Sequence, residues 1–262
     1  MDIITLALSE DIDSGDVSVS LLEDKNITAQ VISRENAVLS GTKYFDKCFT
    51  DVDIEWNFKN GDKISQNDVL CTLTGNNKEI ITKERTALNF LQTLSSTATQ
   101  TNNLVKIVKN TNAQILDTRK TIPMLRKMQK QAVLDGGGVN HRFGLYDAVM
   151  LKENHISQIG ITKAVKLAKQ KYPNLDIIVE VENLEQLKEA DSLDITRILC
   201  DNFDINLLKQ AVKIAKKPLE ASGNIDENNI LKVAETGVDF ISIGSITKNI
   251  AAIDFSLLIE QC

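Results

Sequence analysis

From about residue 113 onward, short apolar runs alternate with stretches whose apolar residues recur at the helical period. The runs that read as strands cover residues 114–117, 148–151, 176–181, 197–200, 218–221 and 240–243. The stretches that read as helices lie near residues 162–171, 184–190, 206–215 and 227–236. Alternation of this kind predicts a parallel sheet whose strands are joined by crossover helices.

The part of the chain before this alternation has a different pattern. Residues 27–39 are rich in β-forming side chains. The apolar runs 54–58 and 69–73 flank a polar turn around Gly61. These features predict a small sheet.

Helices are also expected in this first part. Residues 2–9 predict a short helix, and a long one should run from about Thr82 to Lys109, with Thr82 as its N-cap. The change of pattern near residue 110 indicates a first domain over residues 1–110 and a second over residues 111–262.

A charged or small polar group follows nearly every expected strand of the second part. In chain order these groups are Asp117 to Lys120, Lys152, Glu180, Asp201-Asn202, Ser222-Gly223-Asn224 and Gly244-Ser245. In a parallel α/β barrel all strand C-terminal ends open onto one face, which carries the chemistry. An open doubly wound sheet is the alternative, but its functional residues would gather at one switch point. With about six strands rather than eight, we expect an incomplete parallel barrel.

Composition narrows the class of protein. The chain has 262 residues, 42% of them hydrophobic, and a net charge of −6. This acidity argues against nucleic-acid binding. The four cysteines have neither CxxC nor zinc-ligand spacing, so we expect reduced thiols. Because the N-terminus lacks a basic signal region and no apolar run approaches about 20 residues, we expect a cytoplasmic protein without a membrane span.

The candidate site combines cations, carboxylates and glycine-rich turns. Guanidinium groups bind carboxylates through a bidentate fork, so several arginines suit a planar dicarboxylate. Two carboxylates at neighbouring strand ends suit Mg²⁺ shared with substrate phosphates. Glycine turns after the last two strands, at Ser222-Gly223 and Gly244-Ser245, suit a phosphate group. The cationic candidates are Arg85, Arg119, Lys120, His141, Arg142 and Lys152, and the acidic ones are Glu180 and Asp201.

Each of these features also has an ordinary structural explanation. A loop lysine or arginine is usually just solvated. The run Gly136 to Gly138 fits a flexible turn as well as a phosphate site. His155 fits a structural hydrogen-bonding role as well as a catalytic one. The joint occurrence of these groups at strand ends favours a functional site.

A set of short runs spread over nearly the whole chain forms one pattern. In chain order they lie at residues 10–11, 15–16, 84–92, 116–121, 132–133, 136–142, 144–148, 152–155, 180–184, 201–203, 222–223 and 243–244. With DTRKT at 117–121 and GGGVNHR at 136–142, they resemble the quinolinate phosphoribosyltransferases, also called carboxylating nicotinate-nucleotide pyrophosphorylases. Three departures are visible: Asp13 and Met124 each replace a common glycine, and Ser96-Thr97 replaces a common Gly-Ile.

The resemblance implies an N-terminal α/β sandwich domain packed on the incomplete α/β barrel, whose last residues could return to the first domain. It also implies an intertwined homodimer in which Arg85 acts in the partner's site. The implied reaction joins quinolinate to phosphoribosyl pyrophosphate with loss of CO₂. The products are nicotinate mononucleotide and pyrophosphate, on the route to NAD.

The resemblance gives each candidate residue a role. Quinolinate would be bound by Arg119, His141, Arg142, Lys152 and Arg85 of the partner subunit. The 5′-phosphate would be bound by Ser222, Gly223, Gly244 and Ser245. The expected catalytic residues are Lys120, Lys152, Glu180 and Asp201, of which Glu180 and Asp201 would also hold Mg²⁺.

Rival functions remain open at the level of sequence. A related phosphoribosyltransferase could use another aromatic acid. Lys152 could form a Schiff base in a barrel aldolase. A non-catalytic anion-binding module would hold the same ligands without turnover.

Overall fold

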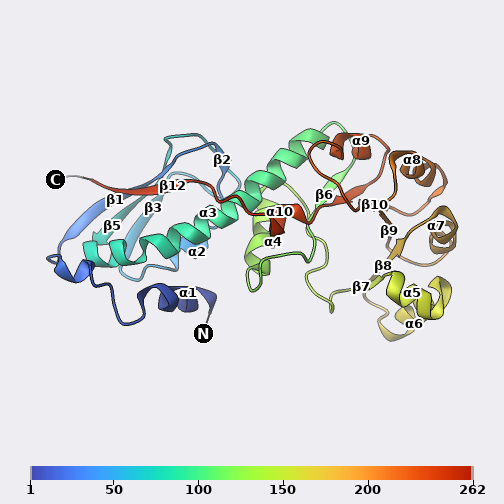
Figure 1. Cartoon of the computed structure of the whole chain (residues 1–262), viewed down its shortest axis with the longest axis horizontal. Helices are drawn as coiled ribbons and strands as arrows, with labels where there is room; N and C mark the ends of the chain where they lie inside the picture. The colour runs from blue at the N-terminus through green and yellow to red at the C-terminus, as the bar shows by residue number, and fades with distance from the viewer. Residues whose placement is uncertain (1, 261–262) are drawn as a thin grey trace. The chain divides into compact units, whose positions relative to one another are not determined.

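The computed structural model describes residues 2–260 and divides into two compact units (Figure 1). Unit 1 comprises Met1–Asn102, Pro123–Gly137 and Asn249–Cys262. Unit 2 comprises Asn103–Ile122 and Gly138–Lys248. The chain therefore passes from one unit to the other more than once. Within residues 2–260, no helix has the length and apolar character needed to cross a bilayer.

Unit 1 is built on a four-stranded antiparallel sheet in the order β12-β1-β5-β3. Its strands are β1 Asn26–Ser33, β3 Val52–Trp56, β5 Val69–Asn76 and β12 Phe255–Ile259. Alternate residues of β1 are buried, as expected for a sheet with one face on the core. The small sheet predicted from sequence is therefore confirmed, whereas no strand was expected at β12.

The predicted β segment 27–39 is interrupted after Ser33, where Arg34, Glu35 and Asn36 form a polar turn. The chain then continues as β2 Ala37–Val38, which pairs with β4 Lys63–Ile64 in a separate two-stranded sheet.

Unit 1 also contains helices. They are α1 Ile3–Ile12, the 3₁₀ turn η1 Val19–Leu21, α2 Thr42–Asp46, α4 Arg126–Asp135 and most of α3 Asn77–Val108, which continues into unit 2. The apolar face of α3 contributes Leu88, Leu91, Leu94 and Ala98 to the core of unit 1.

The predicted N-cap of the long helix, Thr82, is wrong. Helix α3 begins at Asn77, and Thr82 lies inside it. The side chain of Asn76 accepts the backbone N–H groups of Lys78 at 2.8 Å and Glu79 at 3.3 Å. Asparagine therefore satisfies the free amides of the first turn, which is the role expected of Thr82.

Unit 2 holds a six-stranded parallel sheet in the order β6-β11-β10-β9-β8-β7. The strands are β6 Gln114–Leu116, β7 Ala148–Leu151, β8 Asp176–Val181, β9 Arg197–Asp201, β10 Leu219–Ser222 and β11 Phe240–Ser242. Each lies within about a residue of its expected position. Among the described residues no pairing joins β6 to β7, so the barrel is incomplete, as predicted.

The helices of unit 2 follow the strands in alternation, as expected. They are α5 Glu153–Ile159, α6 Ile161–Lys171, α7 Leu184–Asp191, α8 Ile205–Ile214, α9 Ile230–Ala234 and α10 Ser245–Lys248. Helix α9 is shorter than the predicted 227–236 because residues 226–229 form a turn. In this turn the backbone N–H of Asp226 donates to Oδ1 of Asn229, and the backbone N–H of Asn228 donates to Oδ1 of Asp226. Helices α5 and α10 were not expected.

Two departures from the resembled family fall on left-handed backbone. Asp13 has φ +40 and Met124 has φ +66. Both stand where that family commonly has glycine, which adopts this conformation without steric cost. Met124 is 78% exposed, so its side chain gains little from packing. The chain therefore adopts a positive φ at both positions without a glycine.

Replacing Met124 with glycine is expected to raise the free energy of unfolding by about 0.5–1 kcal/mol, because glycine has no Cβ to clash with the backbone at a positive φ. Met124→Ala is the matched control, since it removes the same exposed side chain but keeps the Cβ. Chemical denaturation of the three proteins measures the effect. A glycine variant no more stable than the alanine variant would contradict backbone strain at this turn.

Candidate active site

The register of the parallel strands brings the predicted polar residues to one edge of the sheet. Ser222 of β10 lies opposite Asp201 of β9 and Ser242 of β11. Ser242 in turn lies opposite Leu116, the residue before Asp117. Because these strands run in the same direction, the residues that follow them emerge side by side.

The β7–β8 side of this edge carries an ion pair. The ammonium group of Lys152 contacts Oε2 of Glu180 within hydrogen-bonding distance. The Glu180 side chain is largely buried, and that of Lys152 is about half exposed. An amine that donates to a carboxylate differs from the desolvated neutral amine that a Schiff-base enzyme needs, so this pairing argues against the aldolase alternative.

His155 has a structural contact at the same place. Its Nδ1 accepts the backbone N–H of Lys152 at 3.1 Å. This bond ties the first turn of α5 to the residue that carries the ammonium group. The hydrogen-bonding explanation of His155 therefore fits the structure.

The loops after β9 and β10 are held together through Asn202. Its amide nitrogen donates to Oδ2 of Asp201 at 2.8 Å, and its amide oxygen accepts from Asn224 at 3.1 Å. Its backbone N–H donates to the carbonyl of Ser222 at 2.8 Å. The sequence analysis missed this role, although Asn202 and Asn224 stand in the polar runs after their strands. Asn202 thus joins a catalytic candidate to the expected phosphate loop.

Gly223 has to be glycine in this arrangement. Its φ is +97, and a Cβ built on it would lie 2.2 Å from Oδ1 of Asn202. Both the backbone conformation and the space exclude a side chain. The missing side chain also leaves the backbone of this turn open to a close approach by a ligand.

The loops after β6 and β11 also meet. The Thr247 hydroxyl donates to the carbonyl oxygen of Lys120 at 2.8 Å. A Cβ on Gly244 would lie 2.9 Å from Cδ of Lys120, so the lysine stem passes directly over this glycine. Lys120, Gly244 and Ser245 are therefore neighbours at the end of the sheet.

The segment His141-Arg142 lies beside the end of β6. The backbone N–H of His141 donates to Oδ1 of Asp117 at 2.8 Å, and Nη1 of Arg142 donates to the carbonyl of Ala148 at 3.0 Å. The pKa of Arg142 is lowered, first by burial and then by the positive charge of Arg119, with Asp147 acting the other way. The two neighbouring guanidinium groups repel each other, and a bound dianion would offset that repulsion.

Glu220 and Arg197 are charged residues of unit 2 that the sequence analysis did not single out. Glu220 lies inside β10 and is fully buried, and Arg197 opens β9. Their carboxylate and guanidinium groups approach to 3.0 Å. The only signal in the sequence is a lone acid in the apolar run Leu219 to Ala221.

Gly136 has a packing role. A Cβ on it would lie 2.4 Å from the carbonyl oxygen of Ala98 in α3. Both residues belong to unit 1. The glycine at the end of α4 therefore permits close contact with α3.

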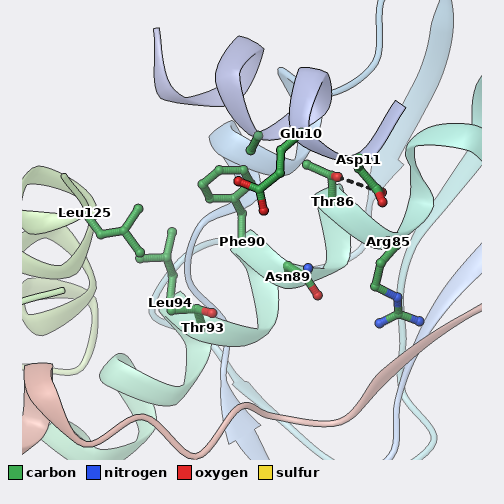
Figure 2. Close-up of a pocket in the computed structure, with 10 residues that line it drawn as sticks. Glu10, Asp11, Arg85, Thr86, Asn89, Phe90, Thr93, Leu94 and Leu125 are labelled. Carbon is green, nitrogen blue, oxygen red and sulfur yellow. Dashed lines mark hydrogen bonds between the residues drawn. The ribbon is translucent and has the colours of Figure 1, made fainter. Parts of the chain in front are cut away.

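Arg85 is the predicted site residue that belongs to unit 1. It lies on α3, and its side chain is 60% exposed. It lines a pocket of about 260 Å³ together with Glu10, Asp11 and Asn89. Figure 2 shows its guanidinium group extending away from Asp11, whose carboxylate accepts from the Thr86 hydroxyl at 3.2 Å. The remaining predicted site residues all belong to unit 2.

Comparison with known proteins gives full-length matches. The family model described as "Quinolinate phosphoribosyl transferase, N-terminal domain" matches residues 2–95, and the corresponding C-terminal domain model matches residues 97–258.

Individual relatives match over most of both chains. The chloroplastic carboxylating nicotinate-nucleotide pyrophosphorylase of Arabidopsis thaliana is 38% identical over 98% of this chain and 82% of its own. A probable enzyme of the same name from Synechocystis sp. is 37% identical over 97% and 90%. The solved structure of the nicotinate-nucleotide pyrophosphorylase from Francisella tularensis is 45% identical, with a TM-score of 0.97 over 98% of this chain and 95% of that one.

Replacing Gly223 with alanine is expected to lower the free energy of unfolding by about 2–3 kcal/mol, because a strained backbone is combined with overlap on Asn202. Gly160→Ala is the matched control: its φ is +76, but a Cβ there would meet nothing within 4 Å. The control should lose only about 1 kcal/mol. Thermal or chemical denaturation measures both.

The overlap itself is tested in a second background. Asn202→Ala introduced into the Gly223→Ala protein should restore part of the lost stability, because the overlapping amide oxygen is gone. Equal losses in Gly223→Ala and Gly160→Ala would contradict the contact with Asn202.

Proposed function

The chain belongs to the quinolinate phosphoribosyltransferase family, and from that premise we propose how its own side chains carry out the reaction. The enzyme transfers the phosphoribosyl group of phosphoribosyl pyrophosphate to quinolinate with decarboxylation, a step of NAD biosynthesis. The observation that carries the assignment of roles is the cationic site at the strand ends of unit 2. There the pKa of Arg142 is lowered, mostly by burial and further by the positive charge of Arg119.

We propose that this cationic site binds the two carboxylates of quinolinate. Arg119 and Arg142 supply guanidinium forks, and Lys152 supplies a point charge. His141 belongs to the same clamp, and Arg85 of the partner subunit completes it. A dianion in the clamp offsets the mutual repulsion of the arginines. It also leaves the ring nitrogen free to face a sugar carbon.

The phosphoribosyl group occupies the other side of the sheet edge in this proposal. Ser222 and Gly223, with Gly244 and Ser245, bind its 5′-phosphate. The support is twofold: Gly223 lacks room for a side chain and Gly244 lies directly under the stem of Lys120, and both glycines follow the last strands of the sheet, where barrels commonly bind phosphate. Lys120 passes over Gly244 and faces the pyrophosphate.

Glu180 and Asp201 fit a magnesium ion that is shared with the substrate. Among the described residues, no group of three or more His, Cys, Asp or Glu side chains could enclose a metal by itself. Mg²⁺ is commonly held by one or two carboxylates, with substrate phosphates and water as further ligands, so this donor set suits it. When bound, the ion would neutralise charge on the pyrophosphate.

The side chains then support a displacement at the ribose C1. Pyrophosphate leaves with the electron pair of its C1–O bond, and positive charge develops on the sugar. The carboxylate of Glu180 or Asp201 stabilises that charge, and Lys120 stabilises the departing anion. The ring nitrogen of quinolinate forms the new bond to C1.

Decarboxylation completes the reaction. The C2 carboxylate leaves as CO₂ and its bonding electron pair stays on the ring carbon, which takes up a proton. The cationic clamp, with the positive ring nitrogen, stabilises that electron pair. The products are nicotinate mononucleotide, pyrophosphate and CO₂.

We further propose that the enzyme is a homodimer with a cytoplasmic location, a sandwich domain over residues 1–110 and a barrel domain over residues 111–262, whose last strand, β12, returns to the sheet of the first domain. The exposed Arg85 on unit 1 supports a role across subunits. The location stays a prediction, because the Arabidopsis thaliana relative is chloroplastic.

Product analysis tests the proposal as a whole. Purified protein is mixed with Mg²⁺, phosphoribosyl pyrophosphate and quinolinate, and nicotinate mononucleotide and CO₂ are followed. Both should appear in equal amounts. A folded protein that yields neither product, or that turns over another aromatic acid instead, would contradict the substrate assignment.

Arg142→Lys is expected to raise the KM for quinolinate about tenfold or more, because lysine keeps the charge but loses the bidentate fork. The KM for phosphoribosyl pyrophosphate should change little. Arg34→Lys is the matched control, since Arg34 makes a single hydrogen bond to Ser256 in the sheet of unit 1. Normal quinolinate kinetics in the Arg142 variant would remove this residue from the clamp.

Arg85→Ala and Lys152→Ala should each be inactive as homodimers yet recover activity when refolded together. If Arg85 acts in the partner's site, each hybrid dimer contains one site without either substitution. Random assembly then gives about a quarter of the wild-type activity. Each variant refolded alone is the control. No recovery in a mixture that does form hybrids would contradict action across subunits.

A further inference from the structure

Glu220 is a buried carboxylate inside the sheet of unit 2. It is the second residue of β10 and has 0% of its surface exposed. Burial of an ionised carboxylate is costly unless nearby charges compensate it. A carboxylate at such a position therefore needs partners that compensate its buried charge.

Two cationic or polar groups contact the same oxygen of Glu220. Oε2 lies 3.0 Å from Nε of Arg197 and 3.3 Å from Nε2 of His141. Neither contact has the full geometry of a hydrogen bond, so short-range electrostatic attraction to the carboxylate holds the cluster together. The Arg197 guanidinium also lies over the ring of Phe240, 4.6 Å from its centre.

This cluster contains an ionised carboxylate. Burial alone would raise the pKa of Glu220. The contact with His141, the charge of Arg197 and the hydroxyl of Ser242 outweigh burial and hold the pKa below its usual range. The charge of Arg197 balances that of the carboxylate.

The hydrogen bonds of His141 define the state of its ring. Its Nδ1 accepts the backbone N–H of Arg142 at 2.7 Å. A nitrogen that accepts a hydrogen bond carries no proton, so the proton is on Nε2, the nitrogen that faces Glu220. The ring is 8% exposed: Nδ1 accepts that hydrogen bond, and Nε2 lies 3.3 Å from Oε2 of Glu220.

We propose that Glu220, paired with Arg197, is a positioning residue for the quinolinate clamp. Its carboxylate selects the Nε2–H tautomer of His141. That tautomer supplies the Nδ1 acceptor that fixes the backbone of Arg142, and the fixed backbone directs the guanidinium group that binds a substrate carboxylate. The proposal rests on the proposed function of the clamp. It makes His141 a member of the clamp through Arg142, which it orients, rather than through a contact of its own with the substrate.

The test removes the acceptor without leaving an isolated charge in the interior. In Glu220→Met/Arg197→Met both members of the ion pair become apolar side chains of similar length, a change that buried ion pairs often tolerate. This variant should raise the KM for quinolinate about tenfold, with smaller changes in kcat and in the KM for phosphoribosyl pyrophosphate. Glu220→Gln keeps an acceptor oxygen and should stay within about threefold of the wild-type KM.

A matched control removes an ion pair elsewhere in unit 2. Lys169 and Asp194 contact each other at 2.7 Å on the surface. Lys169→Gln/Asp194→Asn should leave both KM values unchanged. If Glu220 had only a structural role, the double substitution would lower the free energy of unfolding but would not change the KM for quinolinate more than the KM for phosphoribosyl pyrophosphate.

The tautomer is read directly by nitrogen NMR of histidine-labelled protein. The chain has only two histidines, and His155→Gln assigns the spectrum. In the wild-type protein Nδ1 of His141 should carry no proton, and in the double methionine variant the ring should populate both tautomers. This readout needs no turnover, so it separates failure of this inference from failure of the proposed reaction.

A folded double variant with wild-type KM for quinolinate and an unchanged His141 tautomer would overturn the proposal. If the double variant does not fold, Glu220→Leu/Arg197→Leu removes the same acceptor with the same balance of charge, and the tautomer of His141 is read in the same spectrum. A His141 ring in wild-type protein with its proton on Nδ1 would also overturn it.

Discussion

The chemistry of this enzyme depends on the parallel register of six strands. Because β6 to β11 run in one direction and pair almost residue for residue, whatever follows each strand is delivered to the same edge. Residues far apart in the chain, such as Asp117 and Asp201, thereby become members of one site. The loops need only short hydrogen bonds, such as those of Asn202 and Thr247, to hold their final shape.

A second constraint follows from crowding charges at that edge. Several ionisable groups at that edge have a partner: Lys152 contacts Glu180, Asp201 accepts from Asn202, and Glu220 faces Arg197. Between Arg119 and Arg142 the charges repel each other, and this repulsion adds to burial in lowering the pKa of Arg142. In the proposed function a dianionic substrate offsets that repulsion, which is a form of electrostatic preorganisation.

The sequence predicted the barrel strands well because their apolar runs are short, distinct and each followed by a polar group. It failed where local pattern and tertiary context disagree. Thr82 looked like an N-cap, but Asn76 offers its amide oxygen six residues before it. Strand β12 follows a stretch with no turn signal, and only pairing with β1 makes it a strand. Glu220 was missed because a single acid in an apolar run gives no sign of the groups that face it. Membership of the family came from motifs, whereas the roles of the site residues remain predictions.

The pairing of β12 with β1 has a consequence for biosynthesis. A ribosome makes β1, β5 and β3 first, then the whole of unit 2, and only afterwards residues 255–259. Until then β1 is an edge strand with unpaired backbone groups, a template on which another chain could pair. The sheet made first is therefore finished after the barrel. While the barrel emerges from the ribosome, that edge of the nascent chain is protected only if a chaperone covers it or if synthesis reaches β12 quickly.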